Sequence, residues 1–498
     1  RVLPSLHENI KCGNSLIGPD IYSSVQMTLD NDEDFYRINA FDWNREFSDI
    51  FEKGGFDAVI GNPPYVRQEL LKEYKDYFKE HYEVYHGTAD LYAYFIEKGI
   101  SILKDNGQFS YIVANKWMRA NYGKPLRAWL SKKRIEEIVD FGDLPVFKRA
   151  TTYPCILRIS KGDSRESFEA VQVGTLDFSN LSEYVKEHEH LVKQNSLSDA
   201  GWSLVDENSK ALLDKLMKTG VSLGEYVKGN IYRGIVTGLN TAFVIDEVTK
   251  DRLITEDPKS AEIIKPFLAG RDVKRYKQPI ADKYVIFTRR GIDINKYPVI
   301  LAYLQQFKQE LMPKPKGWKG EWKGRKTGSY QWYEIQDSID YYKEFEKVKI
   351  IYPNICKRPE FTLDDELYYT NQKCFIISKS DKYLLGLLNS KLNYFLFEMI
   401  LPKLRGGFFE PSYVLFKDFP IRTINPSNPE DVTKHDKMVS LVEQMLELHK
   451  KLDGAKLGNE KEMIQRRIDA TDSEIDRLVY DLYGLTDEEI KIVEGVCS

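Results

Sequence analysis

Four consecutive residues, Asn62, Pro63, Pro64 and Tyr65, combine groups suited to binding an amino nitrogen. An Asn side-chain oxygen and a backbone carbonyl held rigid by proline can together accept both hydrogens of one exocyclic amino group. Accepting both hydrogens draws the nitrogen lone pair out of conjugation and aims it at an electrophile. Tyr65 adds a flat face on which a base can stack. These residue types therefore predict chemistry at an amino nitrogen.

The residues before this tetrapeptide indicate where it lies. The stretch GGFDAVIG contains an apolar run, Phe56 to Ile60, which predicts a strand, and the two prolines end it. In an open α/β sheet, ligands bind beyond the carboxyl ends of the strands. A bare Asn-Pro-Pro sequence more often belongs to a loop that simply packs, but its position at a strand end favours the functional interpretation.

Strands and helices alternate over the first third of the chain. The pattern predicts strands at Asn9–Cys12, Phe56–Ile60, Gly107–Ala114, Ile135–Phe141 and Thr152–Ser160, and helices at Arg67–His81, Leu91–Lys104 and Lys124–Lys133. Such alternation implies a largely parallel sheet with helices on both faces, and Thr152–Ser160 is expected at its far end.

Changes in composition divide the rest of the chain. After residues 1–162, residues 163–220 are predicted to form a polar, helix-prone connector, and residues 426–498 have apolar residues at helical spacing. Residues 221–425 contain short strand-like runs at 284–290, 348–353 and 373–378. This middle part is basic, because residues 221–420 carry 33 Lys and Arg against 25 Asp and Glu. The excess suits a polyanionic partner, although charge alone is better explained by a solvated surface.

The overall composition is that of an ordinary globular protein, with 42% hydrophobic and 30% charged residues. No run of about 18 apolar residues occurs that would predict a membrane span, and we expect a cytoplasmic protein. The five cysteines are scattered and form no CxxC pair, which argues against a disulfide framework and a zinc site. We therefore expect reduced, mostly buried thiols and no metal.

The motif FDAVIGNPPY resembles the catalytic motif of amino methyltransferases. Its surroundings resemble the adenine-N6 DNA methyltransferases of the Taq type, especially the large fused restriction-modification enzymes of that lineage. The resemblance spans nearly the whole chain. It implies an α/β fold with the Rossmann-like sheet of methyltransferases that depend on S-adenosylmethionine (SAM), followed by a mixed α+β target-recognition domain and C-terminal helices. It also implies site-specific methylation of double-stranded DNA, with SAM as cofactor and the target adenine extruded from the duplex.

The resemblance implies further site residues. In NIKCGNSL, Asn14 matches the residue that hydrogen-bonds the adenine amino group of SAM, and Asp42 in NAFDW is a rival for this role. Phe95 matches the residue that packs on the adenine ring of the cofactor, although spacing alone favours an ordinary core residue. Phe147, in LPVFKRATTYPCIL, matches the aromatic residue that stacks on the flipped target adenine, which Tyr65 would contact from its other side.

The basic region resembles the target-recognition domain of the family in four segments: GIVTGLNTAFVID (234–246), IIKPFLAGRDVKRY (263–276), YLLGLLNSKL (383–392) and RGGFFEPSYVLFKDFPI (405–421). We expect DNA backbone contacts from Arg271, Lys274 and Arg275. The window KPKGWKGEWKGRKTGSYQWYEI interleaves cations with tryptophans, a combination that suits phosphates and stacked bases. Its candidate DNA-binding residues are Lys319, Lys323, Arg325, Trp318 and Trp322. A solvated loop whose tryptophans pack below it is an equal alternative for any single residue.

One element of the family is missing from the sequence. The glycine-rich SAM loop, expected before Asn9, is absent, so we expect the chain to be the C-terminal part of a larger enzyme, with a sheet that is incomplete at its N-terminal side. A nuclease module, if the parent protein has one, would likewise precede this chain. Three other interpretations stay open: a phage-defence methyltransferase without a nuclease, a catalytically dead DNA-recognition protein, and a methyltransferase that uses the same motif on protein or RNA.

Overall fold

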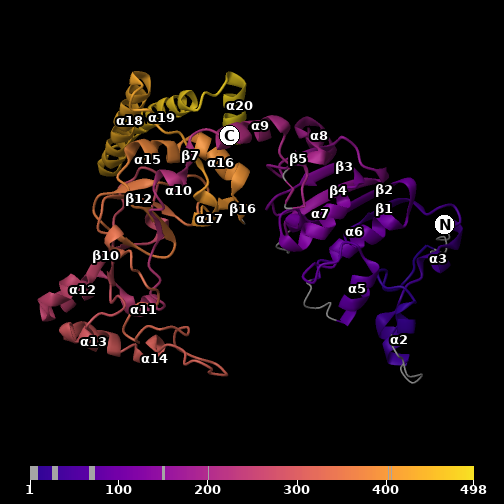
Figure 1. Ribbon diagram of the computed structural model, residues 1–498, viewed down its shortest axis with the longest axis horizontal. Helices are drawn as coiled ribbons and strands as arrows, with labels where there is room; N and C mark the ends of the chain where they lie inside the picture. Colours follow the sequence, from indigo (N-terminus) through magenta and orange to yellow (C-terminus); the bar gives the residue numbers. More distant parts are fainter. Residues whose placement is uncertain are drawn as a thin grey trace. The chain divides into compact units, whose positions relative to one another are not determined.

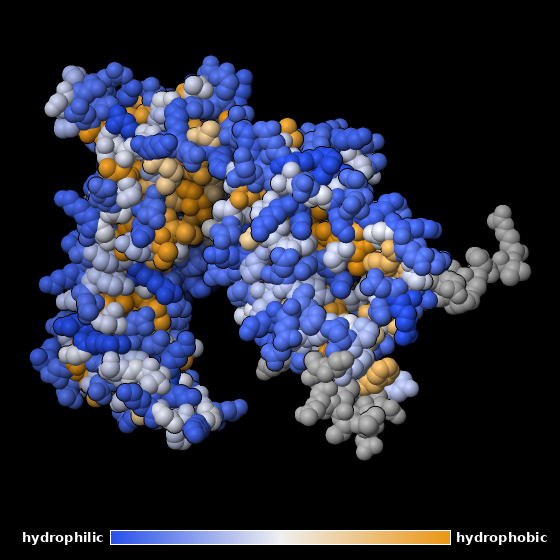
Figure 2. All heavy atoms as spheres, turned by 45° about the vertical axis from the view of Figure 1, so that its right-hand side comes forward, coloured by the Kyte–Doolittle hydropathy of each residue, from blue (hydrophilic) through white to orange (hydrophobic). Residues whose placement is uncertain are grey.

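The computed structural model of the protein describes residues 9–24, 32–66, 73–147, 152–199, 201–202, 204–401, 403–404 and 406–497. The chain forms two compact units, Arg1–Lys210 and Ala211–Ser498 (Figure 1). Hydrophilic side chains cover most of the surface that Figure 2 shows of each unit. None of the described helices has both the length and the hydropathy needed to cross a membrane.

The first unit is built on a six-stranded sheet with the strand order β1-β2-β4-β3-β5-β6. Its strands are β1 (Phe56–Gly61), β2 (Leu103–Ala114), β3 (Lys133–Asp140), β4 (Pro154–Asp163), β5 (Ser167–Gln172) and β6 (His190–Lys193). The helices that connect or precede them include α5 (Lys75–His81), α6 (Tyr92–Ser101), α7 (Lys124–Leu130) and α8 (Leu181–His188). The predicted α/β class and the predicted strand at the opening motif are both confirmed.

Two predictions about this sheet are wrong. The sheet is mixed instead of largely parallel: β1 with β2 and β3 with β5 are parallel, and the other three pairings are antiparallel. The strand predicted at the far end, Thr152–Ser160, is β4, which lies between β2 and β3. Its side chains explain this position, because Cys155, Leu157 and Ile159 are fully buried, as a central strand requires.

Two other expectations for the first unit also need correction. Asn9–Cys12 is not a strand, and only Asn14 makes an isolated bridge, to Ala40. Residues 163–220, predicted as a connector, include β5 and β6, which extend the sheet through pairings with β3 and with each other. Strand β6 lies at the edge of the sheet, where polar side chains such as Lys193 are exposed, which agrees with the polar composition of this segment.

Helix α6 lies against the sheet through a close approach at a glycine. A Cβ atom at Gly99 would come within 2.8 Å of the Phe109 ring on β2, so a larger residue would force the helix outward. Tyr92 and Ile96 of α6 are fully buried in the same core. This packing fixes α6, the helix against which Tyr65 lies.

The second unit contains two four-stranded sheets. One has the order β14-β10-β11-β9, with β9 (Val244–Ile245), β10 (Ile264–Leu268), β11 (Lys283–Ile286) and β14 (Tyr369–Thr370). The other has the order β13-β12-β15-β8, with β8 (Ile231–Arg233), β12 (Lys349–Pro353), β13 (Thr362–Asp364) and β15 (Cys374–Ile377). The strand-like runs predicted at 284–290, 348–353 and 373–378 correspond to β11, β12 and β15, which confirms all three.

Three helices close the chain, as the apolar spacing predicts: α18 (Pro429–Gly454), α19 (Gly458–Leu482) and α20 (Asp487–Cys497). They do not stand apart from the second unit. Met438 and Val442 of α18 and Ile475 of α19 share one hydrophobic core with helix α15 (Lys382–Asn389). Of the four cysteines whose side chains are described, all are free and three are buried, as expected.

A buried ion pair lies at the start of the central strand β12. The Lys349 ammonium is 2.5 Å from the Asp364 carboxylate on β13, and both side chains are fully buried. Lys349 also donates to the Phe345 carbonyl at 2.7 Å, and Asp364 accepts from the backbone of Tyr368 at 2.9 Å. Burial raises the pKa of Asp364 and lowers that of Lys349, so each charge depends on its partner.

The replacement Lys349→Met tests this dependence. It leaves the Asp364 carboxylate buried without a counter-ion, and we expect the free energy of unfolding at pH 7 to fall by about 3 kcal/mol or more. Because Asp364 then has a folded-state pKa above its unfolded value, protonation relieves the penalty, and the deficit relative to wild type should shrink as the pH falls from 7 towards 5. The control Lys347→Met removes an exposed pair with Glu344 and should cost at most about 1 kcal/mol. Equal losses in the two variants, measured by urea unfolding, would contradict the interpretation.

Candidate active site and nucleic-acid interface

The strands of the first unit bring several loops to one edge of the sheet, the edge at which β1, β2 and β3 end. Because β1 is parallel to β2, the Asn62–Tyr65 segment after β1 and Asn115 after β2 leave the sheet at the same edge. Strand β3 runs in the same direction, since both β2 and β3 are antiparallel to β4. The loop after β3, which contains Phe147, therefore also begins at this edge. The predicted base-binding residues are thus placed at a common edge.

Two hydrogen bonds of Asn115 connect the end of β2 to the end of β3 and to the start of β4 at this edge. The Asn115 side-chain amide donates to the Asp140 carboxylate at 2.7 Å, and the Asn115 backbone N–H donates to the Tyr153 carbonyl at 2.6 Å. Asp140 also accepts from the backbone N–H of Gly142 at 3.0 Å, which fixes the first turn of the loop that leads to Phe147. Sequence reasoning missed Asn115 and Asp140, and their only local signal is a polar residue at a strand end.

The Asn62–Tyr65 segment is partly exposed and partly anchored. Asn62 and Pro64 are exposed, whereas Pro63 is buried and Tyr65 is half-buried. The Tyr65 hydroxyl donates to the Ile112 carbonyl on β2 at 3.2 Å, and its ring lies 6.2 Å from that of Tyr92 on α6. Burial raises the pKa of Tyr65 to about 12, so the phenol stays neutral. Tyr65 is therefore held by its hydroxyl rather than standing free as an exposed ring.

The backbone on either side of the segment is also fixed. The carbonyl of Val66 accepts from the N–H of Leu91 at 3.0 Å, just before α6 begins. At the other end, a Cβ atom at Gly61 would come within 2.9 Å of the Tyr111 ring, so glycine lets β1 approach β2 closely there. The Asn62 side chain thus projects from a loop whose two ends are set by packing.

The two rivals for the cofactor amino group belong to adjacent segments. Asn14 bridges Ala40 in a parallel arrangement, and its N–H donates to the Asn39 carbonyl at 2.6 Å. The Asp42 carboxylate caps the short helix α3 (Trp43–Glu46) by accepting from the Arg45 N–H at 3.1 Å. Among the described residues, the Asn14 side-chain oxygen accepts one long bond, 3.4 Å, from the backbone N–H of Leu16. The Asn14 side-chain oxygen is therefore bound more weakly within the protein than the Asp42 carboxylate is.

Phe95 is half-buried on α6, three residues after Tyr92. Its ring packs against the hydrophobic core of the first unit without being enclosed by it. A partly exposed aromatic ring can pack on a flat ligand, which a fully buried ring cannot do. The helix that supports Tyr65 thus also carries the predicted cofactor-packing residue.

The lysine-rich window of the second unit forms an exposed loop. Lys316, Lys319, Lys323 and Lys326 are exposed, and none of them lies within ion-pairing distance of a described carboxylate. Trp318 is 50% exposed and packs edge-on against Trp322, with ring centroids 5.5 Å apart. The geometry suits the predicted DNA contacts of Lys319, Lys323 and Trp318.

Arg325, predicted to contact DNA, instead holds this loop together. It is 4% exposed, and its guanidinium donates to five backbone carbonyls. These belong to Leu311 (2.8 Å), Thr237 (3.1 Å), Glu334 (2.7 Å), Gln331 (3.3 Å) and Trp332 (2.9 Å). Burial lowers the pKa of Arg325 to about 10, so it remains charged at neutral pH. With its donors directed inward, it does not reach a phosphate, and the prediction for this residue is wrong.

The GRDVKRY segment likewise contains both exposed cations and a largely buried one. The Arg271 side chain is 84% exposed, and Lys274 is 53% exposed and 3.3 Å from the Glu360 carboxylate. Arg275 is instead a structural residue, because its guanidinium pairs with Asp472 on α19 and donates to the Asn389 carbonyl at 2.7 Å. A DNA contact of Arg271 and Lys274 remains a prediction, whereas the inward-directed guanidinium of Arg275 contradicts the prediction for that residue.

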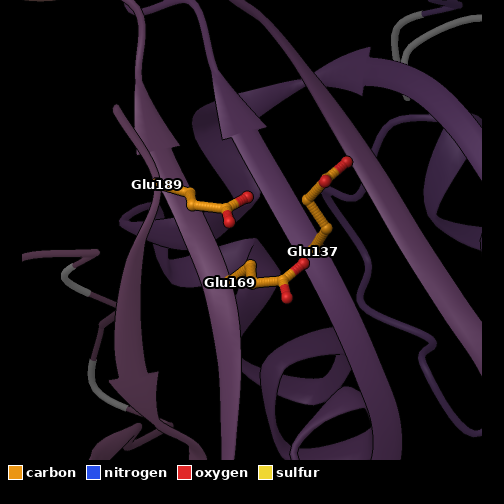
Figure 3. A group of neighbouring side chains, drawn as sticks. All are labelled: Glu137, Glu169 and Glu189. Carbon is orange, nitrogen blue, oxygen red and sulfur yellow. The ribbon is translucent and has the colours of Figure 1, made fainter. Parts of the chain in front are cut away.

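The sequence indicated no cluster of metal-ligating residues, but the structure brings three carboxylates together. Oxygen atoms of Glu137 on β3, Glu169 on β5 and Glu189 after α8 lie within 4.8 Å of one another (Figure 3). The Arg158 guanidinium on β4 lies 3.5 Å from the carboxylates of both Glu137 and Glu169. The positive charge of Arg158 explains how two of the three carboxylates, those of Glu137 and Glu169, can lie close together.

Family comparisons match both parts of this arrangement. Residues 4–147, which include the strand-end motif, match the Eco57I restriction-modification methylase family, and residues 265–421 match the TaqI-like C-terminal specificity domain. The chain thus resembles Eco57I-type methylases in its first part and TaqI-like specificity domains in its second. Among curated relatives, the type II restriction enzyme and methyltransferase RM.Eco57I of Escherichia coli is 25% identical over 99% of this chain and 52% of its own length.

Other relatives agree with this assignment. The type II methyltransferase M.PaeR7I of Pseudomonas aeruginosa is 25% identical over 73% of this chain and 64% of its own length. Among solved structures, the Type IIL restriction-modification enzyme MmeI in complex with DNA superposes with a TM-score of 0.54 at 13% identity, covering 92% of this chain and 59% of that one. This likeness shows the fold. The chain spans about half to two thirds of the length of these proteins.

The replacement Arg325→Ala tests whether this residue is structural. Removing the guanidinium leaves five carbonyls without their donor, and we expect the free energy of unfolding to fall by about 3 to 5 kcal/mol. The control Lys323→Ala, in the same loop but exposed, should change it by at most about 0.5 kcal/mol. Chemical unfolding measures both values. Wild-type stability combined with lost DNA binding in Arg325→Ala would restore the original prediction.

Proposed function

We propose that this protein methylates the N6 amino group of adenine in double-stranded DNA at a specific sequence, as the modification part of a restriction-modification enzyme. The observation that carries the proposal is the position of Asn62, Pro63, Pro64 and Tyr65 directly after β1, at the edge where the Phe147 loop also begins. The family match of the specificity domain favours DNA over a protein or RNA substrate. The DNA complex of MmeI, which shares the fold, agrees with this choice.

In the proposed mechanism, the tetrapeptide binds and orients the target base. Asn62 Oδ1 and the Pro63 carbonyl accept the two amino hydrogens, so that the nitrogen lone pair turns towards the methyl donor. Tyr65 and Phe147 contact the two faces of the base, which must leave the duplex because a stacked, paired N6 is inaccessible. The anchor from the Tyr65 hydroxyl to Ile112 restricts its ring to one orientation, which favours positioning as the source of rate enhancement.

The residues described fit one end of SAM. SAM supplies an electrophilic methyl group when bound. Asn14 would accept the amino group of its adenine, with Asp42 as the alternative, and the half-buried Phe95 would pack on the adenine ring. In the described part of the first unit, no strand leads through a glycine-rich turn into a helix, so we assign no residue to the methionine end.

The side of β1 that faces away from β2 is relevant to how the cofactor would be held. Strand β1 pairs only with β2 among the described strands, and Ile60 on it is 85% exposed. Strands that pair in parallel are normally covered by protein on both faces. The exposure of the apolar Ile60 side chain therefore indicates a surface that other polypeptide could cover. We propose that the remaining cofactor contacts come from polypeptide that covers this edge.

The replacement Asn62→Ala in the full-length protein tests the proposal. The variant loses one of the two acceptors for the amino group, and transfer of labelled methyl from SAM to DNA should fall at least about 10²-fold. DNA affinity should stay within about twofold, because Asn62 is exposed and its side chain forms no hydrogen bond or ion pair with the described residues. Asn208→Ala, an exposed residue of α9 (Glu207–Met217), serves as the matched control and should keep full activity. Full methylation by Asn62→Ala would remove the central role of this residue.

A further inference from the structure

A concave, strongly cationic pocket lies within the specificity domain. It has a volume of about 510 Å³, and all of its lining residues fall inside the segment that matches the domain family. Five cationic side chains and a single carboxylate line it: Arg271, Lys274, Lys357, Arg358, Lys373 and Glu360. Of these, only Arg271 and Lys274 come from a segment predicted to bind DNA.

The cations converge because three separate chain segments approach closely here. A Cβ atom at Gly270 would come within 2.5 Å of the Lys373 carbonyl, so only glycine lets the turn that carries Arg271 lie beside Lys373. On the opposite wall, Cys356 and Phe409 exchange backbone hydrogen bonds of 3.1 and 2.7 Å, which holds the segment of Lys357 and Arg358 in place. The pocket is therefore a product of the fold rather than of mobile surface chains.

Most of the positive charge in the pocket is not neutralised by the protein. Lys274 is paired with Glu360 at 3.3 Å, and Arg271 lies 3.6 Å from Asp272. Lys357, Arg358 and Lys373 are exposed, and no described carboxylate lies within 4.0 Å of their charged groups. Like charges grouped around a concave surface repel one another and favour a bound anion.

The rest of the wall is apolar. Ile355 is 41% exposed and Phe408 is half-buried, and the Lys357 ammonium lies 5.2 Å from the centre of the Phe408 ring. Cys356 offers no nucleophile, because burial raises the pKa of its thiol to about 12. The combination suits a ligand that has an anionic group and an apolar, flat part, which describes a nucleotide.

We propose that this pocket seats one phosphate-bearing nucleotide of the bound DNA strand, with its phosphate held by Lys357, Arg358 and Lys373 and its sugar or base against Ile355 and Phe408. The contact would be independent of base identity, since the charged groups face a phosphate and the apolar wall tolerates any base. The inference rests on the proposed function in taking DNA as the ligand. It adds a binding site separate from the strand-end motif and from the lysine-rich loop.

The double variant Lys357→Ala/Arg358→Ala in the full-length protein tests the assignment. Binding to a labelled pool of random-sequence duplexes is followed by fluorescence anisotropy at several salt concentrations. Each neutralised phosphate contributes about 0.9 to the slope of log affinity against log salt, and the pocket holds one phosphate, so the slope should fall by about 0.9. The control Arg252→Ala/Lys343→Ala removes one exposed arginine and one exposed lysine of the same unit outside the pocket and should leave the slope unchanged. Both cations of the test pair are exposed, and melting temperatures verify that each variant is folded.

The outcomes separate this inference from the proposed function. A reduced slope in the pocket variant alone supports the assignment, whether or not the protein methylates adenine. An unchanged slope, with wild-type protein that binds DNA, overturns it. A third arm measures thermal stabilisation by free deoxyadenosine monophosphate. If the nucleotide stabilises wild type but not the pocket variant, while DNA binding is equal in both, then the pocket serves a free nucleotide and the assignment to DNA is wrong. Failure of the proposed function would appear separately, as DNA binding without methyl transfer.

Discussion

The parallel pairing of β1 with β2 places the candidate active site, because it brings the end of β1 to the edge where β2 and β3 also end. Without that pairing, Asn62 would project from an isolated loop. The Tyr65 hydroxyl bonded to the Ile112 carbonyl fixes the segment across the same pair of strands. The Asn115–Asp140 hydrogen bond does the same for the loop that leads to Phe147. Binding an amino group at two acceptors requires this rigidity, since small displacements of either acceptor would weaken the alignment of the lone pair.

The second unit uses cationic side chains for opposite purposes. Arg325 and Arg275 direct their guanidinium groups inward, to backbone carbonyls and to Asp472, and so stabilise the loop and the attachment of α19. Lys319, Lys323 and Lys357 direct their ammonium groups into solvent and have no described carboxylate partner. The buried cations organise the surface on which the exposed ones are displayed. A surface that binds a polyanion needs both, because exposed cations lose affinity when the backbone that carries them is free to move.

Local patterns predicted much of this fold, and the failures share one cause. Apolar spacing and terminating residues, which are local signals, predicted three strands and two helices that the structure confirms: β1, β2, β3, α6 and α18. The position of β4 between β2 and β3 depends on its pairing with β2, from Ala114 with Pro154 to Gln108 with Ser160, which no local pattern encodes. Similarly, the burial of Arg325 depends on carbonyls from Thr237 to Trp332. The tetrapeptide was found because prolines at a strand end are a local signal, whereas the partners Asn115 and Asp140 carry none beyond their polarity.

The measurement that tests the central claim most directly is mass spectrometry of nucleosides from DNA incubated with the full-length protein and SAM. The proposed binding of one exocyclic amino group by Asn62 and Pro63, between Tyr65 and Phe147, predicts N6-methyldeoxyadenosine as the new modified nucleoside. A methylated cytosine, or methyl groups found in RNA or protein while the DNA remains unmodified, would contradict the account.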